Sequence, residues 1–255
     1  MLLAVDIGNT NIVFGVFEGD RLLHTFRAST SRERTADEYG VLLRELLALR
    51  GLDGGALTAS IVASVVPPLT DVVARAIRQA CARDPVVVGP GVKTGMPVLY
   101  ENPKEVGADR IVNAIAAYDR VRDGVIVVDF GTATTFDCIS SRGEYQGGVI
   151  VPGIQVSLEG LLRHAAKLSR VEIAEPPRVV GRNTVHALQS GLVHGYASLV
   201  DGLIEKLEGE LGKECARIAT GGLAPLIVRH TTHVSQVDPN LTLYGLRLVH
   251  QRNLR

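Results

Sequence analysis

The same short pattern occurs twice in this chain, once at the start and once near the middle. Residues 2–11 are LLAVDIGNTN and residues 125–134 are VIVVDFGTAT. In each copy an apolar run ends in an aspartate, which is followed by an apolar residue, a glycine and small polar residues. A short apolar run without alternation is typical of a strand buried on both faces. Asp6 and Asp129 are therefore expected where these strands leave the core.

The residues after each aspartate suit a tight hairpin that meets a ligand. Gly8 and Gly131 let the backbone turn and leave room for a close approach. The small polar residues beside them offer amide and hydroxyl donors for phosphate oxygens. Residues 12–17 and 135–139 are predicted as the return strands. One such motif is a weak signal, but two indicate a duplicated domain, and a repeat determines the expected fold.

The expected division follows from the repeat, with an N-terminal half at 1–122 and a C-terminal half at 123–255 that hold a nucleotide between them. The first half is expected to read three strands, a helix, a strand, a helix and a strand. Its first helix is predicted at 36–50, because Thr35 and Glu38 form a capping box. In the second half we expect a loop at 171–182 that caps a substrate pocket.

The composition narrows the class of protein. Apolar residues make up 46% of the 255 residues, which is enough for a large core. Lys plus Arg and Asp plus Glu number 27 each, so no basic footprint for nucleic acid is expected. No apolar run approaches the roughly 20 residues that cross a bilayer, and no secretory signal is evident. Three isolated cysteines fit a reducing cytoplasm.

The segment 100–110, YENPKEVGADR, is the second informative stretch. A helix is predicted from Pro103 to about Val121, since proline suits a first helical turn. Gly107 would then lie inside a helix, where glycine costs about 1 kcal/mol relative to alanine unless something approaches the backbone. Asp109 and Arg110 would lie beside that opening. A solvated ion pair is the alternative reading of these two residues.

Three other stretches of the sequence can each be interpreted without a functional role. Residues 89–94, GPGVKT, resemble a phosphate loop, but valine stands where that loop needs glycine before its lysine. Either Asn183 or Thr184 suits the N-cap of a long helix predicted at 185–210. Gly221 and the glycine after it either lie against an adenosine ring or form a plain turn between a strand and a helix.

The doubled hairpin resembles the phosphate motifs of the actin, sugar kinase and heat-shock ATPase superfamily. With the Gly-Ala-Asp-Arg element at 107–110 in a chain of this length, the motifs resemble type III pantothenate kinases along essentially the whole chain. The resemblance implies an α/β, duplicated actin-like ATPase (ribonuclease H-like) fold, with two mixed-sheet subdomains and the nucleotide cleft between them. It also implies ATP-dependent phosphorylation of pantothenate to 4'-phosphopantothenate, the first step of coenzyme A biosynthesis, by a homodimer.

The resemblance also implies roles for individual residues. Asp109 is the expected general base, Asp129 the ligand of a monovalent cation (potassium or ammonium), and Asp6 the residue that orients magnesium, through water. The expected ATP contacts are Asp6, Ile7, Gly8, Asn9, Thr10, Asn11, Ile12, Val13 and Thr132. The expected pantothenate contacts are Tyr100, Gly107, Ala108, Asp109, Arg110 and Thr184.

Two other functions remain open at this point. One is a non-catalytic relative that acts as an accessory factor in transcriptional regulation, which the intact Asp6, Asp109 and Asp129 disfavour. The other is a kinase of the same superfamily that acts on a sugar or a carboxylate. Only the Gly-Ala-Asp-Arg element, through the resemblance, disfavours that second function.

Overall fold

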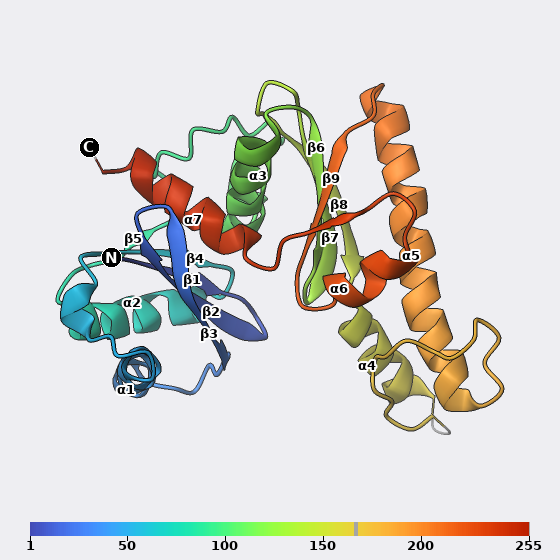
Figure 1. Cartoon of the computed structure of the whole chain (residues 1–255), viewed down its shortest axis with the longest axis horizontal. Coiled ribbons are helices and arrows are strands. Elements are labelled where there is room, and N and C mark those ends of the chain that lie inside the picture. Colours follow the sequence, from blue (N-terminus) through green and yellow to red (C-terminus); the bar gives the residue numbers. More distant parts are fainter. Residues whose placement is uncertain (166–167, 255) are drawn as a thin grey trace. The chain divides into compact units, whose positions relative to one another are not determined.

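Two five-stranded sheets organise the chain, which a computed structural model describes at residues 1–165 and 168–254 (Figure 1). The first sheet has the order β3-β2-β1-β4-β5, and the second, read in the same sense, has the order β8-β7-β6-β9-β10. The chain divides into two compact units, Met1–Ala116 with Leu241–Arg255, and Ala117–Asn240. Each unit therefore contains one sheet with the same arrangement of strands.

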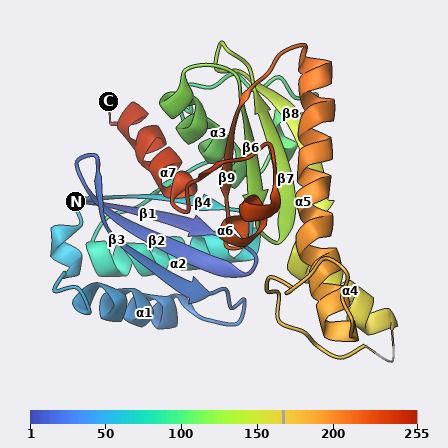
Figure 2. The same cartoon turned by 45° about the vertical axis from the view of Figure 1, so that its right-hand side comes forward.

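The first sheet begins as an antiparallel meander and continues with parallel strands. Its strands are β1 (Leu2–Ile7), β2 (Asn11–Glu18), β3 (Arg21–Ser29), β4 (Ala59–Ser64) and β5 (Val86–Val87). Helices α1 (Ala36–Ala48) and α2 (Pro67–Cys81) share one buried apolar cluster with inward residues of β1 and β2. Figure 2 shows both helices on one face of this sheet and α7 (Leu241–Arg252) on the other. A 3-10 turn, η1 (Gly54–Ala56), precedes β4.

The second sheet repeats this plan. Its strands are β6 (Val125–Phe130), β7 (Ala133–Ile139), β8 (Tyr145–Pro152), β9 (Ala216–Thr220) and β10 (Gln236–Val237). The helices of this unit are α4 (Ile154–His164), α5 (Thr184–Leu211) and α6 (Ala224–Ile227), and a 3-10 turn, η3 (Val228–His230), follows. Residues along one side of α5 share a buried cluster with β6 and β9. The short strand β10 was not expected from the sequence.

The two copies of the motif match residue by residue in burial. In β1 and in β6 four buried residues precede a half-buried aspartate and a buried apolar residue. The next strands, β2 and β7, share the pattern of a half-buried, a buried and a half-buried residue followed by four buried ones. The prediction of a duplicated α/β fold is therefore confirmed at the level of individual strands.

Several predicted boundaries shift by a few residues, and one helix differs more. The capping box forms as predicted, because Thr35 accepts from the Glu38 amide and Glu38 accepts from the Thr35 amide. The predicted helix start at Pro103 is wrong. Residues Pro103–Glu105 form a separate 3-10 turn, η2, and helix α3 runs over Ala108–Val121. Gly107 therefore precedes the helix and does not interrupt it.

The C-terminal helix packs with the first unit, whereas the expected division at 122/123 placed it with the second half. On β2, Phe17 packs edge-on against Tyr244 with ring centroids 5.7 Å apart. On α3, Asn113 accepts a hydrogen bond from Thr242 Oγ1 at 2.8 Å. Gly245 lies so close to α3 that a Cβ there would overlap the carbonyl of Val112. These contacts join the last helix to segments far away in the sequence.

Replacement of Gly245 by alanine tests this packing. The added methyl group has no space against α3, so Gly245→Ala is expected to destabilise the protein by about 1–3 kcal/mol. Gly209→Ala is the matched control, because Gly209 also lies in a helix and nothing stands near its missing Cβ. Alanine there is expected to stabilise by about 0.5–1 kcal/mol. Urea unfolding of both variants measures the difference, and equal stabilities would contradict the packing described.

Candidate functional site

The first Asp-x-Gly loop (residues 6–11) is a tight connection between β1 and β2. Ile7 pairs with Ile12, so four residues, 8–11, lie between the paired positions. The Gly8 amide donates to the Asn11 carbonyl at 3.0 Å, and a Cβ at Gly8 would lie 3.0 Å from the same oxygen. Asn9 and Thr10 are exposed at the tip. The loop therefore exposes the short polar side chains of Asn9 and Thr10, and the Gly8–Asn11 hydrogen bond closes its backbone.

A segment that the sequence analysis did not single out contacts this loop. Thr30 Oγ1 donates to the Gly8 carbonyl at 2.7 Å, and the Thr30 amide donates to the Thr10 carbonyl at 3.0 Å. Arg32 Nη2 donates to Asn9 Oδ1 at 3.3 Å. Thr30 directly follows β3, the strand beside the loop's own hairpin, and Arg32 lies two residues further on. A polar residue just after the third strand of the meander is the only signal that sequence alone offers for them.

The second Asp-x-Gly loop (residues 129–134) is shorter by one residue. Phe130 pairs with Thr134, so three residues, 131–133, lie between the paired positions. The Gly131 amide donates to the Ala133 carbonyl at 3.0 Å. Thr132 is exposed, and its carbonyl accepts from the Gly153 amide at 3.1 Å. Asp129 is half-buried at the end of β6.

Gly221 lies against the carboxylate of Asp129. Strand β9 pairs in parallel with β6, with Thr220 opposite Asp129, and Gly221 follows at once with φ +94°. A Cβ on Gly221 would lie 2.7 Å from Asp129 Oδ1 and 2.6 Å from the Phe130 carbonyl. Only glycine therefore allows the backbone to approach the carboxylate this closely. The interpretation of Gly221 as a plain turn between a strand and a helix did not include this packing requirement.

The Gly-Ala-Asp-Arg element places a desolvated carboxylate at the start of α3. Asp109 Oδ1 accepts from the Arg110 amide at 2.7 Å. Burial raises the pKa of Asp109 above its ordinary value, while the hydrogen bond and the charge of Arg110 act in the opposite direction. A Cβ on Gly107 would lie 2.5 Å from Asp109 Oδ1, so glycine makes room for this orientation. The Arg110 side chain is buried.

Val65 links this element to the first loop. Its amide donates to the Ile7 carbonyl at 3.1 Å, and its Cγ1 lies 3.4 Å from the place of a Cβ on Gly107. Val65 directly follows β4, the parallel neighbour of β1. The structure therefore brings the Gly-Ala-Asp-Arg element to the carboxyl end of β1, where Asp6 is half-buried. Residues about 100 apart in sequence meet there.

The remaining predicted site residues lie in both units. Tyr100, half-buried, precedes η2 in the first unit. Thr184 is the exposed first residue of α5 in the second unit, together with Thr132 and Asp129. The N-cap of α5 is Asn183, whose Oδ1 accepts from the His186 amide at 2.8 Å. The capping explanation of Thr184 therefore does not apply.

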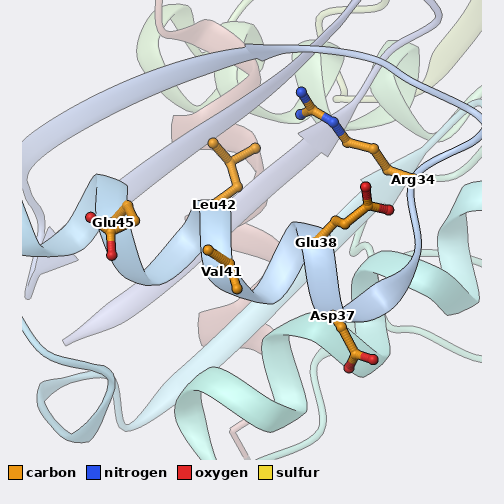
Figure 3. Close-up of a pocket in the computed structure, with 6 residues that line it drawn as sticks. All are labelled: Arg34, Asp37, Glu38, Val41, Leu42 and Glu45. Atoms are coloured by element: carbon orange, nitrogen blue, oxygen red, sulfur yellow. The ribbon is translucent and has the colours of Figure 1, made fainter.

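A surface hollow of about 510 Å³ lies elsewhere, along the outward side of α1 (Figure 3). It contains none of the predicted site residues. Its lining residues are Arg34, Asp37, Glu38, Val41, Leu42 and Glu45. Two of its carboxylates have structural partners, since Glu38 closes the capping box and Asp37 accepts from Gln79 at 3.1 Å. We therefore seek the candidate site residues in the two loops, each within its own unit, and not in this hollow.

The described part of the chain contains neither a cluster of metal-binding side chains nor a membrane-spanning helix. Residues 1–165 and 168–254 contain no group of three or more His, Cys, Asp or Glu side chains arranged to hold a metal ion. Within the same residues no helix is both long and apolar enough to cross a membrane.

Comparison with known proteins identifies the relatives of this chain. A family model described as Type III pantothenate kinase matches residues 2–206. A type III pantothenate kinase of Myxococcus xanthus is 56% identical over 253 residues, which is 99% of each chain. Among solved structures, a putative 2-dehydro-3-deoxygalactonokinase of Sinorhizobium meliloti matches with TM-score 0.61 at 12% identity, covering 100% of this chain and 97% of that one.

A second solved structure has a similar fold. A putative Baf family transcriptional activator of Campylobacter jejuni matches with TM-score 0.59 at 20% identity and covers 98% of each chain. At these identities the two structures show a shared fold and nothing more. The fold is thus that of actin-like kinases and ATPases, and the family assignment rests on the closer sequence relatives.

Proposed function

The chain belongs to the type III pantothenate kinase family, and we propose that its Asp-x-Gly loops position ATP while Asp109 activates pantothenate. The reaction transfers phosphate from ATP to the alcohol group of pantothenate, which gives 4'-phosphopantothenate in the first step of coenzyme A biosynthesis. The roles proposed for the loops and for Asp109 rest on one observation. A carboxylate with a raised pKa lies beside the first loop, at the carboxyl end of β1.

Asp109 is the general base in this proposal. Phosphoryl transfer depends mainly on positioning and charge stabilisation, so the protein must hold the hydroxyl and accept its proton. A general base works best when its pKa approaches the working pH, and burial moves the pKa of Asp109 in that direction. The Arg110 amide fixes one oxygen of the carboxylate. The other oxygen, Oδ2, then receives the proton of the attacking hydroxyl.

The other residues around Asp109 bind pantothenate. Arg110 provides a buried guanidinium for the pantothenate carboxylate, and such charge-assisted bonds are among the stronger ones in proteins. Gly107 and Ala108 let the substrate approach the backbone beside the base. Tyr100 and Thr184 complete the proposed contacts, and support for these two comes from the family motif alone.

Residues 6–13 and Thr132 bind ATP in this proposal. The side chains of Asn9 and Thr10 are exposed in a loop that the Gly8–Asn11 hydrogen bond closes. They can donate hydrogen bonds to phosphate oxygens. Magnesium accompanies ATP and keeps several of its waters, since it gives them up reluctantly. Asp6, half-buried at the end of β1, would orient those waters.

Asp129 holds a monovalent cation, potassium or ammonium, in this proposal. The residues fit such an ion in their chemistry, because Asp129 Oδ1 and the Phe130 carbonyl both lie against Gly221 and are oxygen atoms of the kind that hard cations bind. A cation there supplies positive charge that offsets the charge of the phosphates. The chain's own contribution is to hold this half-buried carboxylate at the end of β6, against Gly221.

A homodimer in the cytoplasm is the proposed state of the enzyme. Among the described residues of the second unit, large apolar side chains are exposed at Ile150, Val156, Leu161, Val179, Val180 and Val185. They lie on β8, on α4, and on α5 with the loop before it, and α4 contacts α5. Exposed apolar residues in such number are typical of an interface, here with a second copy of the chain. Sedimentation of the purified protein measures this assembly.

A panel of acceptors tests the proposed function. Purified protein receives magnesium-ATP with pantothenate, with hexoses or with small carboxylates, and phosphorylated products are identified by mass spectrometry. We expect phosphorylation of pantothenate alone, giving 4'-phosphopantothenate. Phosphorylation of a sugar or a carboxylate in place of pantothenate would contradict the proposed substrate.

A further inference from the structure

One position occurs in both units directly after the third strand of the meander, and it contacts the Asp-x-Gly loop of its own unit. In the first unit Asn11 pairs with Ser29, and Thr30 follows. In the second unit Ala133 pairs with Pro152, and Gly153 follows. The Thr30 amide donates to the Thr10 carbonyl at 3.0 Å, and the Gly153 amide donates to the Thr132 carbonyl at 3.1 Å. Thr30 and Gly153 are therefore equivalent positions of the repeat.

The two positions differ in what their side chains do. A Cβ on Gly153 would overlap the Thr132 carbonyl and lie 2.6 Å from the Gly131 carbonyl, so the second loop leaves room for glycine alone. In the first unit the loop is one residue longer, and a threonine fits. Its hydroxyl Oγ1 donates to the Gly8 carbonyl at 2.7 Å. Thr30 thus holds two carbonyls of the first loop, one through its backbone and one through its side chain.

These two hydrogen bonds determine which way the loop amides point. A trans peptide is planar, and its carbonyl and its N–H point to opposite sides. Since the Gly8 carbonyl is held toward Thr30, the N–H of Asn9 points away from Thr30. In the same way, the hydrogen bond from the Thr30 amide to the Thr10 carbonyl orients the Thr10–Asn11 peptide. Loss of the hydroxyl would let the Gly8–Asn9 peptide rotate.

Thr30 is itself held by the core of the first unit. Tyr39, buried on α1, accepts from the Ser31 amide at 3.0 Å and donates to the Ser31 carbonyl at 2.8 Å. On the other side of Ser31, the Arg32 guanidinium donates to the Asn9 side chain. The segment 30–32 therefore connects a rigid helix to both the backbone and a side chain of the loop.

We propose that Thr30 is a positioning residue for ATP, because its hydroxyl orients the Gly8–Asn9 peptide so that the Asn9 N–H faces the phosphates. This inference rests on the proposed function, in which residues 6–13 bind ATP. It assigns Thr30 no contact with either substrate. The effect of losing the hydroxyl should therefore appear in ATP binding and not in pantothenate binding.

The test compares Thr30→Val, which removes the hydroxyl at constant shape, with Thr30→Ser, which keeps it. Thr58→Val is the matched control, since Thr58 Oγ1 also donates to a backbone carbonyl, that of Met1, which directly precedes β1, whereas Gly8 directly follows it. For Thr30→Val we expect KM for ATP to rise about five- to tenfold, as for one net hydrogen bond. KM for pantothenate and the unfolding midpoint should equal those of Thr58→Val. Thr30→Ser should stay near wild type.

Two results would overturn the inference. One is an ATP KM for Thr30→Val equal to that of Thr58→Val. The other is equal weakening by Thr30→Ser and Thr30→Val, which would assign the effect to packing and not to the hydroxyl. The Kd of magnesium-ATP, measured by calorimetry, tests the same ranking without turnover, so an inactive wild type would contradict the proposed function separately. Thr30→Ala replaces Thr30→Val if the valine variant fails to fold.

Discussion

Asp109→Asn is expected to lower kcat for pantothenate phosphorylation by about 10²–10⁴-fold, the usual contribution of a general base. The amide keeps the size of the side chain and can still accept from the Arg110 amide. It cannot accept the proton of the attacking hydroxyl. A coupled assay of ADP release at saturating ATP and pantothenate measures the change.

Asp37→Asn is the control for this variant. Asp37 lies on α1 in the same unit and accepts a hydrogen bond from Gln79, but it belongs to the hollow on α1 and not to the candidate site. Its kcat should equal that of wild type. A turnover of Asp109→Asn near that of Asp37→Asn would show that Asp109 is not the base.

The raised pKa of Asp109 also predicts how stability depends on pH. Because burial raises this pKa, the folded protein holds the proton more tightly than the unfolded chain does. The ionised carboxylate therefore lowers stability once the pH exceeds the ordinary aspartate value of about 3.9, and increasingly so up to the raised folded value. Asparagine does not ionise. Asp109→Asn should thus be at least as stable as wild type at neutral pH, and this gain should disappear in acid. Urea unfolding at both pH values measures it.

Gly221→Ala has the second largest expected effect. Alanine at φ +94° is strained, and its Cβ would lie 2.6 Å from the Phe130 backbone and 2.7 Å from Asp129 Oδ1. Strain and overpacking together are expected to cost about 2–5 kcal/mol. The same methyl group would displace the Phe130 carbonyl and the Asp129 carboxylate, the two oxygen ligands proposed for the cation, so the potassium concentration for half-maximal activity should rise in any folded fraction.

Gly212→Ala separates the two contributions. Gly212 also has a positive φ, +69°, but nothing lies near its missing Cβ. Gly212→Ala should lower the free energy of unfolding by about 1 kcal/mol, from backbone strain alone, and should leave the potassium dependence unchanged. If Gly221→Ala were no less stable than Gly212→Ala and kept its potassium dependence, the close approach of Gly221 to Asp129 would be wrong.

Local patterns in the sequence were sufficient to predict most of each sheet. The apolar runs that end in Asp6 and Asp129 predict buried strands, and the structure confirms both with the same burial pattern. The capping box at Thr35 likewise depends on residues three apart. Such features depend only on residues that are neighbours in the sequence. Asp6 and Asp129 were singled out in this way, because they lie near strand ends, whereas the proposed roles of Asp109 and the other site residues come from the resemblance to type III pantothenate kinases.

Features that depend on distant contacts could not be predicted in this way. Gly107 was assigned to a helix interior because Pro103 can begin a helix, yet 103–105 close as a separate turn and α3 begins at Ala108. The need for glycine at 221 arises from β6, about 90 residues earlier, which becomes its neighbour only through parallel pairing. Thr30 reaches the first loop only because β3 lies beside β2. No local pattern marks these contacts.

The central claim is tested most directly by ADP release from purified, folded protein with magnesium-ATP, with and without pantothenate. Potassium, ammonium or sodium is the only monovalent cation in each reaction. We predict release that requires pantothenate and is faster in potassium or ammonium than in sodium. Equal rates in all three salts would remove the proposed role of Asp129 and leave the kinase in place. Absence of pantothenate-dependent release in every salt would contradict the proposed function.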